Sequence, residues 1–231
     1  MIIDLEFTDR VVTGVMLAKQ DQIIQLVIAE RTLLPFGQTD IHSHEATYQA
    51  WKTNENSFRV IDSGIVEGVD YHMLTYTDRA INLDTVTACK GQVVTGVRFR
   101  KVNGHLSLEI RSTEFDFKTG LLKNVDQSMW VTSPNSGKTP IALQKPTDPT
   151  AEPKILFPNH TPNSYIEFQP TDFWSDAAQY TVPFIDAIKL EPYVPVALSG
   201  IGLFYKGDAQ SGFISPKLVV YDFESYLPES S

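Results

Sequence analysis

VVTGVMLAKQDQIIQLVIAE, residues 11–30, and VVTGVRFRKVNGHLSLEIRS, residues 93–112, begin with the same five residues and decide the fold. An offset of 82 residues (93 − 11) also superimposes the apolar positions that follow: Ile24 on Leu106, Leu26 on Leu108 and Ile28 on Ile110. Apolar and polar residues alternate there, which is the period of a strand with one buried face. Between the two halves of the second copy, Asn103-Gly104 is a preferred two-residue hairpin turn because both residues tolerate positive φ. Each copy therefore predicts a β-hairpin.

A third and more divergent copy lies at residues 196–224, VALSGIGLFYKGDAQSGFISPKLVVYDFE. Ser-Gly-Ile at 199–201 stands where the second copy has Thr-Gly-Val at 95–97, and YDF at 221–223 is similar to FDF at 115–117. We therefore expect the three glycines of these motifs, Gly14, Gly96 and Gly200, to occupy equivalent backbone positions.

Acidic lead-in segments precede the second and third copies. Asp84 lies eleven residues before Thr95, and Asp186 lies thirteen residues before Ser199. These spacings indicate that each repeat consists of a lead-in strand, a hairpin and a return strand.

Three units, at about 1–50, 60–130 and 165–227, predict a single all-β domain with pseudo-threefold repeats. The proline-rich segment 133–164 is interpreted as an insertion, because proline removes donors from a strand ladder. Hairpins related by a threefold axis close as a β-prism or a β-trefoil, and the length of these units favours a β-prism-like fold. A β-trefoil and a β-sandwich are the alternatives.

The composition narrows the class of protein. The chain has 231 residues and a formal net charge of −9, with its basic residues scattered, so nucleic acid is not an expected partner. Its single cysteine, Cys89, excludes an intrachain disulfide. No stretch approaches the roughly 20 apolar residues of a membrane span, so no membrane-spanning helix is expected. The start at Met1 carries no signal-peptide pattern, and we expect a longer precursor with any export signal upstream.

The amino-acid sequences of several segments resemble those of a known family. VVTGVRF at 93–99, LSLEIRSTEFDFKTG at 106–120, RTLLPFGQTD at 31–40 and LSGIGLFYKG at 198–207 are similar to the C-terminal part of a secreted insect protein family of unknown function. The resemblance implies an extracellular location and an additional N-terminal region, and it supplies no catalytic residues. The repeat pattern itself is similar to the β-prisms of jacalin-like lectins and vitelline membrane outer layer proteins, a likeness of fold alone.

Aspartates near the ends of predicted strands are the first candidates for a site: Asp78, Asp84, Asp116, Asp186 and Asp222. Aspartate at a strand end caps backbone amides in most proteins, whereas in prism lectins it accepts hydrogen bonds from sugar hydroxyls. Exposed aromatic rings could stack on pyranose faces. The candidate ligand-binding residues are accordingly Trp51, Asp78, Asp84, Trp174 and Asp186.

Two further sites are weaker candidates. His42 and His44 would project from one face of a strand as a pair of metal ligands, but no further ligand is evident beside them, so neither a metal nor another cofactor is expected. Asn159 begins an N-glycosylation sequon, Asn-His-Thr, and predicts an exposed loop in an exported chain.

These observations predict a non-enzymatic extracellular module that binds glycan or another component of the extracellular matrix. The alternative is a structural or assembly protein that uses the same surfaces for self-association or for docking a missing N-terminal region.

Overall fold

The computed structural model describes residues 10–20, 23–40, 67–68, 71–151 and 155–226, and these form an all-β fold. The helices among them are short 3-10 turns, at Pro35–Gly37, Val125–Gln127 and Glu224–Tyr226.

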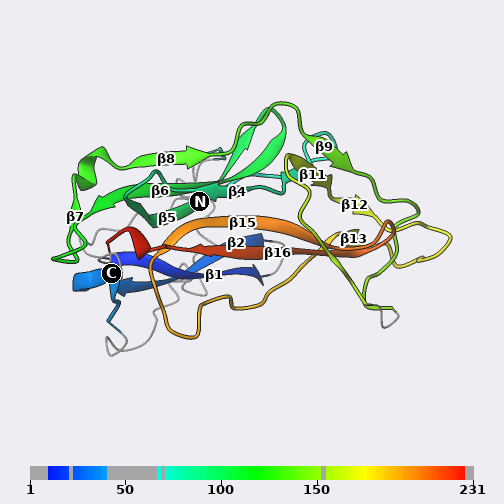
Figure 1. Ribbon diagram of the computed structural model, residues 1–231. Helices are drawn as coiled ribbons and strands as arrows, with labels where there is room; N and C mark the ends of the chain where they lie inside the picture. Colours follow the sequence, from blue (N-terminus) through cyan, green and yellow to red (C-terminus); the bar gives the residue numbers. More distant parts are fainter. Residues whose placement is uncertain (1–9, 21–22, 41–66, 69–70, 152–154, 227–231) are drawn as a thin grey trace.

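Three long antiparallel hairpins build the body of the fold, one from each copy read in the sequence. They are β1 (Arg10–Gln20) with β2 (Ile23–Thr32), β5 (Gln92–Val102) with β6 (His105–Phe115), and β15 (Leu198–Gly207) with β16 (Gly212–Val220). We call them hairpins 1, 2 and 3. In Figure 1 hairpin 2 lies above hairpins 1 and 3.

Each hairpin has a β-bulge at the same place, directly before the glycine of its motif. The register shifts between Val12 and Gly14, between Val94 and Gly96, and between Leu198 and Gly200. The extra residue is Thr13, Thr95 or Ser199, and each hydroxyl lies 3.3 to 3.5 Å from the carbonyl oxygen of the residue opposite the glycine. The expected equivalence of the three glycines is therefore confirmed.

Equivalent positions of the three hairpins also fill the core. The main cluster takes three matched sets of buried side chains: Val12, Val94 and Leu198; Val15, Val97 and Ile201; Ile28, Ile110 and the half-buried Leu218. A second cluster contains Val11, Val93 and Ala197 with Leu33 and Phe115. Because each fully buried aliphatic side chain contributes roughly 1.5–3 kcal/mol, the shared core stabilises the three hairpins together.

Short lead-in strands connect the hairpins. β3 (Ala80–Asn82) runs parallel to β6, and β14 (Phe184–Ile185) runs parallel to β16. The chain then crosses to a different hairpin. β4 (Thr85–Thr87) pairs with β15, and Leu190 pairs with Val15 of β1. We call residues 186–192 the crossover segment.

The parallel registers correct one detail of the sequence alignment. Ile81 faces Leu106 and Ile185 faces Ile214, so the residue equivalent to Asp186 is Asn82, not Asp84. An offset of 104 residues relates Asn82 to Asp186 as well as Gly96 to Gly200.

The remaining strands are short. β7 (Leu122–Lys123) and β8 (Met129–Thr132) pair with β6, and β11 (Ser164–Glu167) lies between β3 and β9 (Thr139–Ile141). β10 (Pro158–Asn159) pairs with β15, and β12 (Gln169–Pro170) pairs with β13 (Thr181–Val182). β9, β11, β12 and β13 lie at one end of the molecule and β7 at the other (Figure 1).

Replacement of Gly200 by alanine is expected to lower the free energy of unfolding by about 1–3 kcal/mol. A Cβ there would lie 2.6 Å from the carbonyl oxygen of Val86 and 3.2 Å from Cα of Thr87, both backbone atoms of the paired strand. Urea denaturation measures the effect. The control, Thr87→Ala, removes an exposed side chain at the same contact and should change stability by less than about 0.5 kcal/mol. Equal stability of the two variants would contradict the close approach.

Candidate functional site

Asp84 is buried and paired with a cation from the proline-rich segment. Its Oδ2 accepts a hydrogen bond from Nζ of Lys138, and the two side chains are 9% and 2% exposed. The backbone carbonyl of Asp84 also accepts a hydrogen bond from the amide of Leu203. This carboxylate therefore attaches the segment to hairpin 3 and is not accessible to a ligand.

The Lys138→Met variant is expected to lower the free energy of unfolding by about 3 kcal/mol, because it leaves the carboxylate of Asp84 buried without its cation. The double variant Lys138→Met, Asp84→Leu removes both charges and should recover most of the loss. Thermal and urea denaturation of both variants tests this. A single variant as stable as the wild type would mean that the pair does not anchor the segment.

The other strand-end aspartates make local contacts. Asp78 forms an ion pair with Nζ of Lys101 at 2.7 Å. The ammonium of Lys123 and the backbone amides of Thr119 and Lys118 donate hydrogen bonds to the carboxylate of Asp116 and lower its pKa to about 2. Asp222 caps the following 3-10 turn through the amide of Glu224. These contacts match the structural reading of strand-end aspartate.

Several sequence candidates lie elsewhere. Trp51, His42 and His44 fall outside the described residues, so their roles stay predictions. Asn159 lies on β10, where its Oδ1 accepts hydrogen bonds from the amide and the hydroxyl of Thr161. Among the residues that the structure describes, no group of three His, Cys, Asp or Glu side chains could hold a metal ion.

Trp174 is the most exposed tryptophan of the described chain. It lies at the tip of the loop between β12 and β13, with 91% of its surface exposed, and its ring meets that of Phe173 edge to face at a centroid distance of 5.6 Å. The loop is held by hydrogen bonds from its own aspartates: Asp172 accepts from Ser175, and Asp176 accepts from Thr171. The two rings are therefore presented to solvent on an ordered turn.

More aromatic rings continue from the base of this loop onto the sheet of hairpin 3. Tyr180 meets Phe184 at 6.2 Å, and Phe184 meets Phe213 at 6.0 Å, both edge to face. We call Phe173, Trp174, Tyr180, Phe184 and Phe213 the aromatic strip. Lys206 pairs with Phe213 across the hairpin and places an ammonium group beside it.

The sequence analysis missed Phe184 and Phe213, although a signal was present. Leu203 and Tyr205 alternate with Phe204 and Lys206 along β15, and the first pair is buried. The second pair and its strand neighbours therefore belong to the other face of the sheet.

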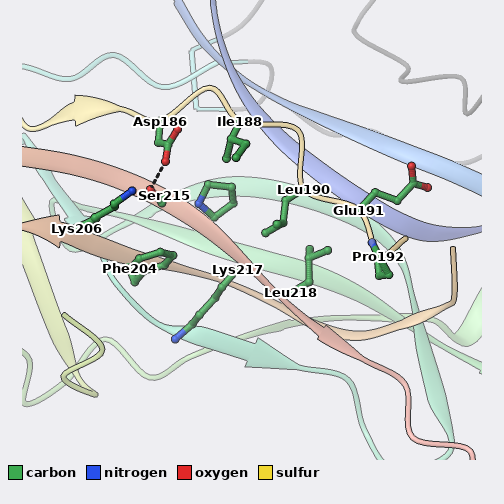
Figure 2. Close-up of a pocket in the computed structure, with 11 residues that line it drawn as sticks. Asp186, Ile188, Leu190, Glu191, Pro192, Phe204, Lys206, Ser215, Lys217 and Leu218 are labelled. Atoms are coloured by element: carbon green, nitrogen blue, oxygen red, sulfur yellow. Dashed lines mark hydrogen bonds between the residues drawn. The ribbon is translucent and has the colours of Figure 1, made fainter. Parts of the chain in front are cut away.

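A groove of about 500 Å³ lies beside this face, between the crossover segment and hairpin 3 (Figure 2). Its apolar lining includes Ile188 and Leu190 from the crossover segment, Phe204 from β15, and Pro216 and Leu218 from β16. Asp186 stands at one end of the groove, where its Oδ2 accepts a hydrogen bond of 2.7 Å from the hydroxyl of Ser215 (Figure 2). Of the predicted ligand-binding aspartates, Asp186 is the one that lines this groove.

Lys206 and Lys217 also line the groove. Burial lowers the pKa of Lys217, and the nearby charge of Asp84 opposes that shift. The groove thus combines an apolar floor with the carboxylates of Asp186 and Glu191 and the ammonium groups of Lys206 and Lys217. Glu191 is already paired with Arg31, whereas Asp186 is bonded to Ser215. A few polar groups around an apolar floor are typical of a binding surface.

Glu30 is a buried carboxylate in another part of the fold. It is 3% exposed, and in the described structure neither carboxylate oxygen makes a hydrogen bond. Burial raises its pKa from 4.5 to about 7, against the opposing charge of Arg10, whose Nη1 lies 3.9 Å from Oε2. Glu30 pairs with Val12 in hairpin 1, so the charge lies beside the first bulge.

The chain matches no protein-family model and is not significantly similar to any curated protein. No helix within the described ranges is long and apolar enough to cross a membrane.

The Glu30→Gln variant is expected to change the dependence of stability on pH. Because the folded-state pKa of Glu30 lies above its unfolded value, the folded state binds more protons and loses stability as pH rises from about 4.5 to about 7. The variant should therefore be more stable than the wild type at pH 8, by on the order of 1–3 kcal/mol, and similar to it at pH 4. Urea denaturation across this range, with the exposed Glu114→Gln as control, measures the difference. Parallel pH curves of wild type and Glu30→Gln would show that Glu30 does not titrate in this range.

Proposed function

We propose that this chain is a non-enzymatic, extracellular binding module whose ligand is a glycan or another component of the extracellular matrix. The observation that carries the proposal is the aromatic strip. Phe173, Trp174 and Tyr180 are exposed, and Phe184 and Phe213 on the sheet face are half-buried. Accessible aromatic rings stack on the apolar faces of pyranose units. Lys206 beside Phe213 supplies a hydrogen-bond donor to sugar hydroxyls.

A β-prism-like arrangement of the three hairpins is part of the proposal. Bulges at matched positions and matched core residues support it, because a prism places equivalent strands around one interior. In such an arrangement the residues of the loops and of the outer sheet faces are not constrained by the shared core. The aromatic strip lies on one such loop and on the adjoining sheet face.

The extracellular location rests on the resemblance of the sequence to a secreted insect family. Asn159 is consistent with that location, since it is half-buried and the other two residues of its sequon, His160 and Thr161, are exposed. The proposal includes no enzymatic role, and the carboxylates of Asp78 and Asp84 are engaged in ion pairs with Lys101 and Lys138.

Exposed apolar residues on the crossover segment and just after it favour the second candidate, an assembly or structural protein. Ile188, Tyr193 and Val194 are each more than half exposed. Large exposed apolar side chains that lie close together in the chain often mark a protein contact. Self-association of the purified chain in sedimentation velocity would favour this candidate.

A glycan array that includes chitin oligomers tests the proposal on the folded chain. Trp174→Ala and Phe213→Ala are each expected to lower binding by about twofold to tenfold, because stacking on a ring contributes about 0.5–1.5 kcal/mol. Trp51→Ala, in the same array, tests the remaining sequence candidate.

Tyr76→Ala is the matched control, since Tyr76 is 84% exposed and lies outside the aromatic strip, beside Arg79. It should bind glycan as the wild type does. Absence of binding by the wild-type protein over the whole array would contradict the proposal and leave the assembly role.

A further inference from the structure

In hairpin 2 the outer edge of the second strand, β6, is paired with an additional strand, β8. β8 pairs with β6 on the side away from β5, with Thr132 opposite Glu109 and Val131 opposite Ile110. β8 also contacts β4, the strand that crosses from this lead-in to hairpin 3. The hydroxyl of Thr132 donates to the carbonyl of Leu108 and extends the ladder by one residue.

The same edge of hairpin 3 has no strand partner in the described residues. β14 pairs with β16 at Phe213 and Ile214, and the last bond on this side joins the amide of Asp186 to the carbonyl of Ile214 at 2.9 Å. Peptide groups of a strand point alternately to its two neighbours. The carbonyl of Pro216 and the amide and carbonyl of Leu218 therefore face the open side.

The groove occupies the position that β8 fills in hairpin 2. Leu218 is equivalent to Ile110, because each comes immediately before the residue that faces the bulge glycine. The opposite wall is the crossover segment, with Ile188 and Leu190 (Figure 2), at the place that β4 takes beside β8. A volume of about 500 Å³ is enough for a short extended segment, and β8 itself has four residues.

Asp186, at the polar end of the groove, determines which kind of side chain a bound segment needs at that position. In hairpin 2, Nδ2 of Asn82 donates to Oδ1 of Asn135, three residues after the end of β8. Asn82 also donates a hydrogen bond to the hydroxyl of Ser107. The equivalent pair in hairpin 3 is bonded in the opposite direction, with the hydroxyl of Ser215 donating to Asp186. A carboxylate in place of the amide can only accept, so a partner residue at this position must donate, and a cation does so most strongly.

We propose that hairpin 3 binds an extended segment of a partner protein by strand addition to the open edge of β16. The segment contributes about four residues in β conformation, which pair with Lys217 to Val220, and a lysine or arginine three residues further on that binds Asp186. This is a peptide site, separate in ligand class from the glycan site proposed for the aromatic strip. The crossover segment forms the wall of the groove opposite β16. The space between them therefore admits a single extended chain but not the edge strand of another sheet.

Two synthetic peptides test the proposal. The first copies residues 127–138 of this protein, QSMWVTSPNSGK, and the second carries Asn135→Lys. Each is labelled with fluorescein and titrated with the full chain while fluorescence anisotropy is measured. The lysine peptide is expected to bind at least tenfold more tightly than its parent.

Variants separate strand addition from nonspecific adsorption. Asp186→Asn should remove the preference for the lysine peptide, whereas Glu114→Gln, an exposed carboxylate on hairpin 2, should keep it. A lysine peptide that also carries Val131→Pro lacks a ladder donor and should not bind. Hydrogen exchange of the Leu218 amide should slow when the lysine peptide is bound.

Three results would overturn the proposal. One is no binding of the lysine peptide up to about 1 mM, a weak affinity limit near −4 kcal/mol. Another is equal binding by the Asp186→Asn variant or by the Val131→Pro peptide. The third is a stable dimer of the chain that protects Leu218 without peptide, which would assign the edge to a second copy. None of these readouts depends on Trp174, so a failed glycan array and a failed peptide experiment are distinguishable.

Discussion

The close approach of a crossing strand to a glycine of a hairpin is the constraint on which the rest of the structure depends. A side chain at Gly200 would meet the carbonyl of Val86 at 2.6 Å, and one at Gly14 would meet the carbonyl of Leu190 at 2.8 Å. In both places the backbone of one lead-in lies against a different hairpin. These contacts hold the hairpins together through their backbones, and the bulge before each glycine bends the strand toward the neighbour.

The space between a crossing strand and its hairpin is then used in two ways. At hairpin 2 it is filled by the chain itself, through β8 and the buried pair of Lys138 with Asp84. At hairpin 3 the corresponding space is the groove that Asp186 and Leu218 line. In a fold assembled from similar units, the same kind of space can thus be filled by the chain in one unit, which adds stability, and stay open in another unit, where a ligand can bind.

Much of the fold could be predicted from the sequence because strand periodicity and turn chemistry are local. The three hairpins, the turn at Asn103-Gly104 and the equivalence of the motif glycines all follow from residues close together in the chain. The alignment of Asp84 with Asp186 was wrong for a physical reason. The parallel pairing of each lead-in with its hairpin determines the register, and Ile81 and Ile185 face equivalent residues. Asn82 is therefore the counterpart of Asp186, and Asp84 lies two residues further along the chain.

The sequence by itself determined the all-β class and the three hairpins, since alternation, glycine and turn residues act over a few residues. Only the tertiary structure decided which aspartate is buried and which faces a groove. Asp84 and Asp186 occur in similar local sequences, and they differ because Lys138, 54 residues away, reaches one and not the other. Burial of a charge depends on what long-range packing brings to it, and local sequence carries no record of that.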